Sequence, residues 1–294
     1  MFTIPRRKLA TLSVLGAAVL FGTTGTVLVN APDSADAYSV GSLRLLIGGA
    51  TLLAVALRGG RAAISQPWRA PFAGLTIVGA LGVAVFQLGY FLAVQRTGVA
   101  EGTVATIGSG PVLSGALNAV IHRRPPDRRW LVGTVISVSG VALLGLAGRD
   151  SAVDIVGIGM AMCAGLGWAV FATVGKHQID RGVKSTAIMA AMFGGGAVVL
   201  SPLLLAHSPA WVLSASGLLV ALYLGVVTVG VAYTLYGIAL RHLPAPTVIT
   251  LTLLEPITAS LLGAVVVHEG IRPAGWVGVA LVLVGLMLTA TVAE

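Results

Sequence analysis

Charged side chains are scarce in this 294-residue chain. Asp, Glu, Lys and Arg make up only 10% of it, whereas a soluble domain has about 25%. Hydrophobic residues make up 56% and the mean hydropathy is +0.97. A soluble fold of this size could not hide so much apolar surface from water, so the expected solvent is lipid. The composition therefore argues against a soluble globular domain and favours an all-α polytopic membrane protein.

Cysteine and the usual signatures of catalysis are also nearly absent. Cys163 is the only cysteine, so it can form no intramolecular disulfide, and it lacks the partners of a metal site. The sequence contains no Walker sequence, no His-Glu-x-x-His run and no Gly-x-Ser-x-Gly elbow. We therefore expect no cofactor, no metal and no ATP-driven pumping by this chain. An intramembrane enzyme remains an alternative, as does a non-transporting membrane subunit.

Long apolar runs are what the sequence has in abundance. About 20 apolar residues are needed to cross the hydrocarbon core as a helix. Ten runs qualify, and prolines such as Pro32, Pro67 and Pro209 lie at or near the breaks between them. They cover residues 9–29, 37–57, 70–93, 99–121, 130–147, 153–175, 186–206, 213–239, 244–267 and 272–291.

The basic residues predict the orientation of these spans. The net charge of +8 invites a nucleic-acid interpretation, but most Lys and Arg residues sit in short loops. Fourteen of the 18 lie in the loops on the N-terminal side, three lie on the other side, and Arg44 lies within a span. Cytoplasmic loops carry such an excess. We therefore expect a multi-pass protein of the inner (plasma) membrane with both termini in the cytoplasm, and no nucleic-acid partner.

The two halves of the chain are related. An offset of 145 residues places Phe91 on Tyr236, Arg96 on Arg241 and Pro111 on Pro256, and an offset of 147 places Gly48-Gly49-Ala50 on Gly195-Gly196-Ala197. Each half has five spans, an odd number, so the second half must enter the membrane from the opposite side. The sequence thus predicts two inverted five-helix repeats, residues 9–147 and 153–291, as in many secondary transporters.

The chain resembles the drug/metabolite transporter superfamily, in particular its ten-helix EamA type. Three stretches carry the resemblance: Leu20-Phe21-Gly22-Thr23, Arg44-Leu45-Leu46, and Leu254-Glu255-Pro256 through His268-Glu269. His268 stands where the family often has glycine, and Gly110 and Arg123-Arg124 replace in the first half the acids of the second. The resemblance implies transport of small metabolites such as amino acids without ATP.

Two ionisable residues lie inside spans. Glu255 is near the centre of its span, where a charge costs about 2.5–3.5 kcal/mol, so it should face protein or a watery cavity. It is a candidate for proton coupling or for binding a substrate amine, and the alternative is a cap for backbone freed by Pro256. Arg44 is a candidate for binding a substrate carboxylate, and the alternative is snorkelling or pairing with carbonyls.

Aromatic and polar side chains supply the remaining cavity candidates. Aromatic walls with a few hydroxyls and amides suit a semi-apolar solute, although ordinary helix packing explains the same residues. Those on shared helix faces or near the in-span prolines are Gln87, Tyr90, Phe91, Ser109, Trp168, Tyr233, Tyr236 and Thr252. Glu101 and Glu269, at span ends, are expected to be solvated charges.

The sequence predicts a secondary transporter that exports small metabolites, such as amino acids or related amines, by alternating access. Its partners are the lipid bilayer and a small solute. Whether the chain is a monomer or a homodimer stays open at this stage, as do the substrate and the coupling ion.

The loop charges generate a test of topology. We expect reporters fused at the C-terminus and after Arg61 to read cytoplasmic, and a reporter fused after Asp33 to read external, because basic loops stay inside. Alkaline phosphatase and green fluorescent protein fusions measure this. An external C-terminus would contradict the ten-span topology and with it the inverted repeat.

Overall fold

The fold is all-helical in the part of the chain that the structure describes. The structure is a computed structural model that describes residues 5–123, 125–146, 154–266 and 273–292, and no strand occurs in these ranges. Within them, nine helices are long and apolar enough to cross a membrane. The chain is an all-α polytopic membrane protein. His268 and Glu269 lie outside the described residues, and the side chain of Glu101 is likewise not described.

Every predicted span has a helical counterpart, and α6 adds a tenth helix to the nine. The long helices are α1 (Arg6–Leu28), α2 (Ala37–Leu57), α4 (Ala73–Thr97), α5 (Val99–His122), α6 (Arg128–Leu146), α7 (Ile155–Asp180), α8 (Ser185–Ala206) and α13 (Pro273–Val292). The eighth span consists of α9 (Ala215–Leu222), η3 (Tyr223–Val231) and α10 (Ala232–Leu240), and the ninth of α11 (Ala245–Leu251) and α12 (Leu254–Val266). Connecting segments form α3 (Arg61–Ser65), η1 (Gln66–Trp68) and η2 (Ala210–Leu213).

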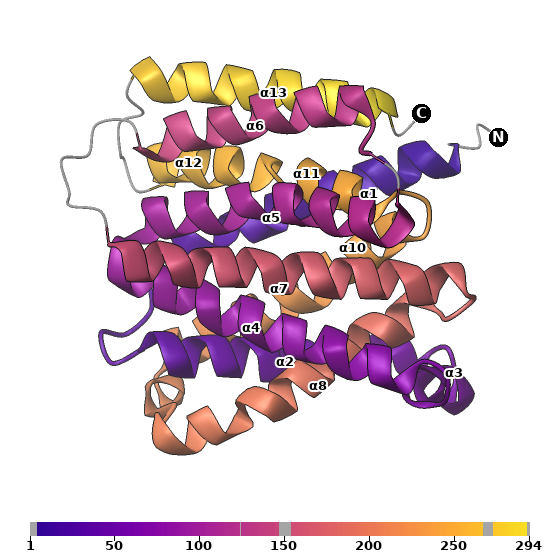
Figure 1. Cartoon of the computed structure of the whole chain (residues 1–294). Coiled ribbons are helices and arrows are strands. Elements are labelled where there is room, and N and C mark those ends of the chain that lie inside the picture. Colours follow the sequence, from indigo (N-terminus) through magenta and orange to yellow (C-terminus); the bar gives the residue numbers. More distant parts are fainter. Residues whose placement is uncertain (1–4, 124, 147–153, 267–272, 293–294) are drawn as a thin grey trace.

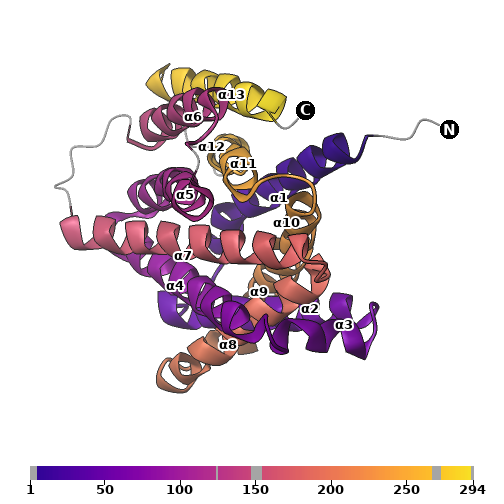
Figure 2. The ribbon, with the colours of Figure 1, turned by 45° about the vertical axis from the view of Figure 1, so that its right-hand side comes forward.

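Helix contacts repeat when the two halves are exchanged. The second helix of each half packs on its counterpart as α2 on α8, and the last helices pair as α6 on α13. The pairing of α4 with α7 has its equivalent in α10 with α1, and that of α5 with α7 in α12 with α1. Figure 2 shows α6 and α13 side by side at one edge of the bundle. This exchange of partners is what a two-fold relation between the halves produces.

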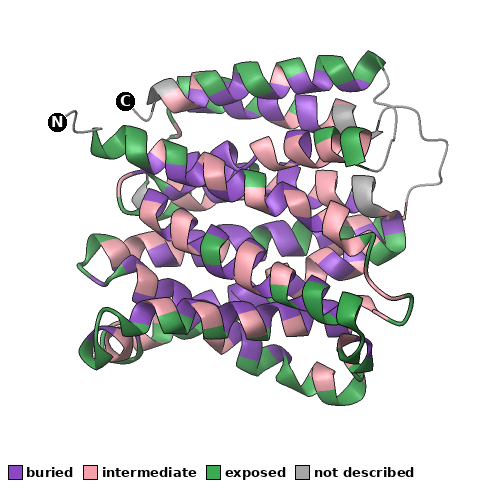
Figure 3. Ribbon diagram, turned by 180° about the vertical axis from the view of Figure 1, so that it is seen from behind, coloured by how far each residue is buried: buried purple, intermediate pink, exposed green. Residues whose placement is uncertain are grey.

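The bundle is arranged as a stack of roughly antiparallel helices with both chain ends at the same end (Figure 1). A chain that crosses the membrane an even number of times has both ends on the same side. Buried residues concentrate along the inner faces of the helices, while exposed apolar residues cover the outer faces (Figure 3). Exposed leucine and valine are expected on these faces because lipid is as apolar as they are.

Within the described parts of the ten spans, two departures from regular α-helix occur, and both are in the second half. The segment η3, Tyr223–Val231, is π-helical and packs against α2. The ninth span breaks at Thr252 and Leu253, so that α12 begins at Leu254. Pro256 then falls in the first turn of α12, where its missing N–H costs no hydrogen bond.

Glycine allows the outer pair of helices to approach closely. A Cβ atom at Gly140 of α6 would lie 2.7 Å from the carbonyl oxygen of Gly278 and 2.8 Å from the backbone nitrogen of Val282, both on α13. Small residues at such contacts let the backbones of membrane helices approach closely, so that the helices are held together by van der Waals packing. The pair α6–α13 therefore depends on the absence of a side chain at this position.

Replacing Gly140 with alanine should separate α6 from α13. Because the clashing atoms belong to backbone, the helices must shift, and overpacking of this kind costs about 1–3 kcal/mol. We expect Gly140→Ala to lower the thermal midpoint of the purified protein in detergent. The matched control is Gly159→Ala, because a Cβ at Gly159 of α7 would meet nothing within 4 Å. Equal midpoints for the two variants would contradict this packing.

Candidate functional site

A small cavity lies inside the bundle, between the two halves. Its volume is about 20 Å³, which is room for about one water molecule. Helices α1, α2, α4 and α5 border it from the first half and α7, α10 and α12 from the second. The lining residues are Phe21, Thr24, Arg44, Phe86, Tyr90, Ile107, Trp168, Tyr233 and Glu255.

Arg44 brings a positive charge to this cavity. Its side chain is buried, with 7% of the residue exposed, and its Nε atom has no hydrogen-bond partner among the described residues. The guanidinium carbon lies 5.9 Å from the ring centroid of Phe91, within the range of a cation–π contact. Phe91 can take this place because Gly41, one turn before Arg44, has no side chain: a Cβ there would lie 3.0 Å from the ring. The guanidinium is thus directed inward and not toward the membrane surface.

Glu255 brings a carboxylate to the same cavity from the opposite half. It is half-buried and lies in the first turn of α12, where the exposed N–H groups of a helix favour negative charge. The helix break immediately before it is closed by backbone hydrogen bonds from Leu253 to Thr250 (3.0 Å) and from Glu255 to Thr252 (2.9 Å). Backbone N–H groups at the break therefore already have backbone partners and do not need the side chain of Glu255. No ion pair joins Arg44 to Glu255 among the described residues.

Aromatic rings form the walls between the two charges. Phe21 and Tyr233 face each other at 4.9 Å between ring centroids, and Phe86 and Trp168 at 5.6 Å. Tyr90 donates to or accepts from Thr103 Oγ1 at 3.1 Å, which fixes its ring beside the cavity. The arrangement is a mostly apolar chamber with a few polar groups, which is typical of small-molecule sites.

Two glycines allow the elements around the cavity to pack closely. A Cβ at Gly22 of α1 would lie 2.8 Å from the carbonyl oxygen of Glu255, so the glycine lets α1 touch the start of α12. A Cβ at Gly110 of α5 would lie 2.9 Å from the indole of Trp168. Gly110 occupies the repeat position of Glu255. Where the second half has an acid, the first half therefore has a glycine that leaves room for the indole of Trp168.

The cavity brings together half of the residues singled out from the sequence. Arg44, Tyr90, Trp168, Tyr233 and Glu255 line it. The other five do not line it. Two of these five are neighbours of lining residues: Gln87 is buried beside Phe86, and Phe91 packs against Gly41 and Arg44.

Tyr236 lies behind Tyr233, with 5.6 Å between ring centroids, and is fully buried in the core. Ser109 donates a hydrogen bond to the carbonyl oxygen of Thr106 (3.1 Å), and Thr252 donates one to that of Ile249 (2.7 Å). These three residues support the walls and do not border the cavity.

Four lining residues were missed by sequence reasoning. Phe21 is part of a motif that was noticed, and Thr24 lies one turn after it. Phe86 and Ile107 carry no polar group and resemble the many other apolar residues of their helices. To predict that Phe86 and Ile107 line the cavity, the rotation of their helices would have to be known.

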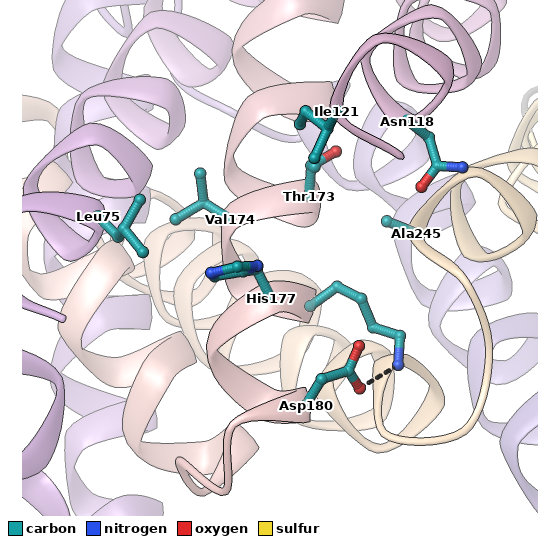
Figure 4. A pocket seen from close by; sticks show the side chains of 9 residues that line it. Leu75, Asn118, Ile121, Thr173, Val174, His177, Asp180 and Ala245 are labelled. Atoms are coloured by element: carbon teal, nitrogen blue, oxygen red, sulfur yellow. Dashed lines mark hydrogen bonds and ion pairs between the residues drawn. The ribbon is translucent and has the colours of Figure 1, made fainter. Parts of the chain in front are cut away.

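A second, larger pocket opens near the chain ends. It has a volume of about 220 Å³ and lies between the ends of α4, α5, α7 and α11. Figure 4 shows Thr173, His177 and Asp180 along α7, with Asn118 of α5 across from them. Asp180 forms an ion pair with Lys176. It shares α4, α5 and α7 with the central cavity, and Thr173 lies five residues beyond Trp168 on α7.

Contacts between loops close the opposite end of the bundle. Nδ1 of His207 lies 3.5 Å from Oδ1 of Asp36, and its ring stacks on Tyr38 with 4.3 Å between centroids. Trp211 donates a hydrogen bond from Nε1 to Oγ of Ser39 (3.0 Å).

Asp36 itself caps the start of α2 through the backbone N–H groups of Tyr38 (2.9 Å) and Ser39 (3.1 Å). Burial raises the pKa of Asp36, but hydrogen bonds from Ser39 and Tyr38 and the nearby His207 outweigh it and leave the pKa below its usual value. The carboxylate is therefore ionised at neutral pH and available to His207.

Comparison with known proteins identifies the family. The EamA-like transporter family matches residues 8–146 and again residues 155–291. The chain belongs to the EamA-like transporter family. The two matched stretches give each half of the bundle the same ancestry, in agreement with the exchange of helix contacts.

Individual relatives agree with this assignment. The uncharacterised transporter YwfM of Bacillus subtilis is 36% identical over 94% of this chain and 92% of its own length. The threonine/homoserine exporter RhtA of Escherichia coli K12 is 30% identical over 84% of this chain and 77% of its own length. A solved crystal structure has the same fold, with a TM-score of 0.81 and 20% identity over 97% of both chains. The chain is a transmembrane transporter of the drug/metabolite transporter type.

The position of Tyr236 behind the cavity generates a prediction. Tyr236→Phe should leave abundance and transport close to those of the wild type, because its hydroxyl does not reach the cavity. Tyr236→Ala should lose folded protein, because emptying a fully buried aromatic site costs about 3–5 kcal/mol. Membrane abundance, size-exclusion profile and solute flux measure the two effects. An alanine variant that folds normally but does not transport would instead place Tyr236 in the solute path.

Proposed function

We propose that this transporter exports small amino acids in their zwitterionic form, by alternating access at the central cavity. The observation that carries the proposal is the placement of Arg44 and Glu255 on one cavity. A guanidinium recognises a carboxylate through a planar array of donors, and a carboxylate accepts hydrogen bonds from an ammonium group. One charge of each sign, without a direct ion pair between them, matches the two ends of an amino acid.

The separation of the two charges between the halves supports alternating access. Arg44 belongs to the first repeat and Glu255 to the second, so a solute that binds both links the two moving bodies. In inverted-repeat transporters the site lies at the repeat interface, and one repeat rocks against the other around it. The pocket of about 220 Å³ is then the cytoplasmic entrance, and the contacts of Asp36 and His207 close the external exit.

Two further observations support the direction and place of transport. The relative RhtA is named as an exporter of threonine and homoserine, which are small zwitterions. The excess of basic residues in the loops next to the entrance pocket supports a cytoplasmic position for that end. The proposed location is the plasma membrane with both termini inside.

A related amine without a carboxylate is the second candidate substrate. It would use Glu255 and the aromatic walls but would leave Arg44 without a partner. Because a buried guanidinium without a partner is costly, the zwitterion is the better match.

The role of Arg44 is tested by separating the two ends of the substrate. Arg44→Gln should raise the KM for an amino acid such as threonine by about tenfold or more, because hydrogen bonds to charged groups are worth about 1.5–3 kcal/mol. The same variant should affect the methyl ester, which lacks the carboxylate, much less. The measurement is competition of each compound with radiolabelled threonine in proteoliposomes.

Arg96→Gln is the matched control for this experiment. Arg96 is exposed and pairs with Asp154 at 3.0 Å, away from the cavity. An equal change in KM for the acid and the ester in Arg44→Gln, with normal abundance, would count against carboxylate recognition and favour the amine.

The role of Glu255 is tested by coupling. If its carboxylate exchanges a proton for the substrate ammonium, an imposed proton gradient should drive solute against its own gradient. Glu255→Gln keeps the size and the hydrogen-bonding capacity but cannot release a proton. We expect it to abolish gradient-driven accumulation while solute exchange persists. Equal accumulation by both proteins would remove Glu255 from the coupling step and leave it a structural role at the start of α12.

A further inference from the structure

A long apolar groove runs along the outside of the bundle, away from both pockets described above. It lies between α2, α4 and α8 and has a volume of about 400 Å³. Its floor consists of small residues, which are Ala80, Ala190, Ala191, Gly194 and Gly195. Its rims carry exposed large side chains, including Ile77, Leu81 and Val198, with 52%, 47% and 72% of the residue exposed.

The groove reaches from one end of the bundle toward its middle. On α4 it starts near Ile77, about one turn after the helix begins, and on α8 it extends from Ala190 to Val199, roughly 14 Å at 1.5 Å per residue. That length fits within one leaflet of a hydrocarbon core about 30 Å thick. An occupant must therefore be apolar along this stretch and have its other end at the membrane surface.

The surface end of the groove is formed by α3 and η1. Ile64 and Trp68 border the groove there. A Cβ at Gly195 would lie 3.4 Å from the indole of Trp68, so the ring reaches over the floor of the groove. Trp68 is 45% exposed, as expected of tryptophan at the level of the lipid headgroups.

Positive charge surrounds this end without acidic neighbours on the same helices. Arg61 lies one turn before Ile64, Arg69 follows Trp68, and both are exposed. Lys184 donates a hydrogen bond from Nζ to the carbonyl oxygen of Gly59 (3.3 Å), directly after α2. Residues 37–97 and 181–254, which contain every element that borders the groove, include no Asp or Glu.

We propose that this groove is a binding site for an anionic phospholipid, with an acyl chain between α2, α4 and α8 and the phosphate group bound by Arg61 and Arg69. Anionic headgroups attract basic residues near the membrane surface by about 1 kcal/mol for each charge. Arginine also matches phosphate oxygens with a planar array of donors.

A second copy of the chain fits the same groove less well. A two-fold interface pairs the same patch on both subunits. It would bring the arginines and Lys184 of both copies together without acids from these helices to offset them. Like charges brought together in this way oppose association.

Quenching of Trp68 fluorescence by brominated lipids tests the proposal on the full chain. The protein is placed in phosphatidylcholine vesicles that contain either brominated phosphatidylglycerol or brominated phosphatidylcholine, and Trp68→Phe identifies the signal from Trp68. We expect stronger quenching by brominated phosphatidylglycerol at equal mole fraction. In Arg61→Gln/Arg69→Gln the preference should fall by roughly fivefold for each charge removed, the factor that corresponds to about 1 kcal/mol.

Two controls separate the headgroup from the acyl chain. Arg128→Gln/Arg129→Gln removes two basic residues at the start of α6, away from the groove, and should keep the preference. Gly194→Leu projects a side chain where a Cβ meets nothing within 4 Å, so the fold should tolerate it while the groove is filled and quenching by either lipid falls.

Equal quenching of Trp68 by both lipids in the wild type would overturn the proposal, because it would leave only unspecific contact with lipid. Little quenching by either lipid, together with a dimer in size-exclusion chromatography, would overturn it in favour of a second copy. The readout does not involve transport, so it stands apart from the assignment of the substrate.

Discussion

A guanidinium and a carboxylate inside an apolar solvent impose the central constraint on this structure. Neither Arg44 nor Glu255 can face lipid, because a charge at that depth costs several kcal/mol. The other helices must therefore enclose both side chains, and seven elements meet around them. The glycines at positions 22, 41 and 110 follow from the same requirement, since each removes a side chain that would hold a helix or an aromatic ring away from the cavity.

The two repeats are alike in backbone and unlike in charge. At the repeat offsets, Glu255 corresponds to Gly110 and Arg44 corresponds to Ala191. Each half thus contributes one charge, and its counterpart in the other half is a small residue. Gly110 gives its space to Trp168, and Ala191 lies on the floor of the outer groove. A symmetric scaffold can rock between two equivalent states, while the asymmetric charges make the two sides of the central cavity electrostatically different.

The sequence predicted the helices better than their rotation. Hydropathy located every span because the length of a membrane helix is set by the bilayer. The rotation of a helix depends on its neighbours, and apolar residues occur on all its faces here. The face of α4 shared by Gln87, Tyr90 and Phe91 was recognised, but only Tyr90 borders the cavity. Phe86 was missed for the same reason, since nothing in its chemistry separates it from a residue in contact with lipid.

Local backbone irregularity was beyond the reach of hydropathy as well. The segment Tyr223–Val231 reads as part of a continuous apolar helix, and its π-helical form arises where it packs against α2. Pro256 indicated a disturbance of the ninth span, but the break lies three to four residues earlier, at Thr252 and Leu253, since proline is tolerated in the first turn of a new helix.

The small volume of the cavity suggests a role for these irregular segments in the proposed transport. About 20 Å³ is far less than an amino acid occupies, so the binding that we propose requires the helices around the cavity to separate. The break before Glu255 and the π-helical segment before Tyr233 both lie next to lining residues, whereas α4 and α5 of the first half are continuous where they border the cavity. A break in the hydrogen-bond ladder is where a helix bends at least cost, and π-helical segments often occur at functional sites. Under the proposed mechanism we expect the helices of the second repeat to bend, so that the carboxylate at position 255 moves with the first turn of α12 while the regular helix α2 holds the guanidinium at position 44.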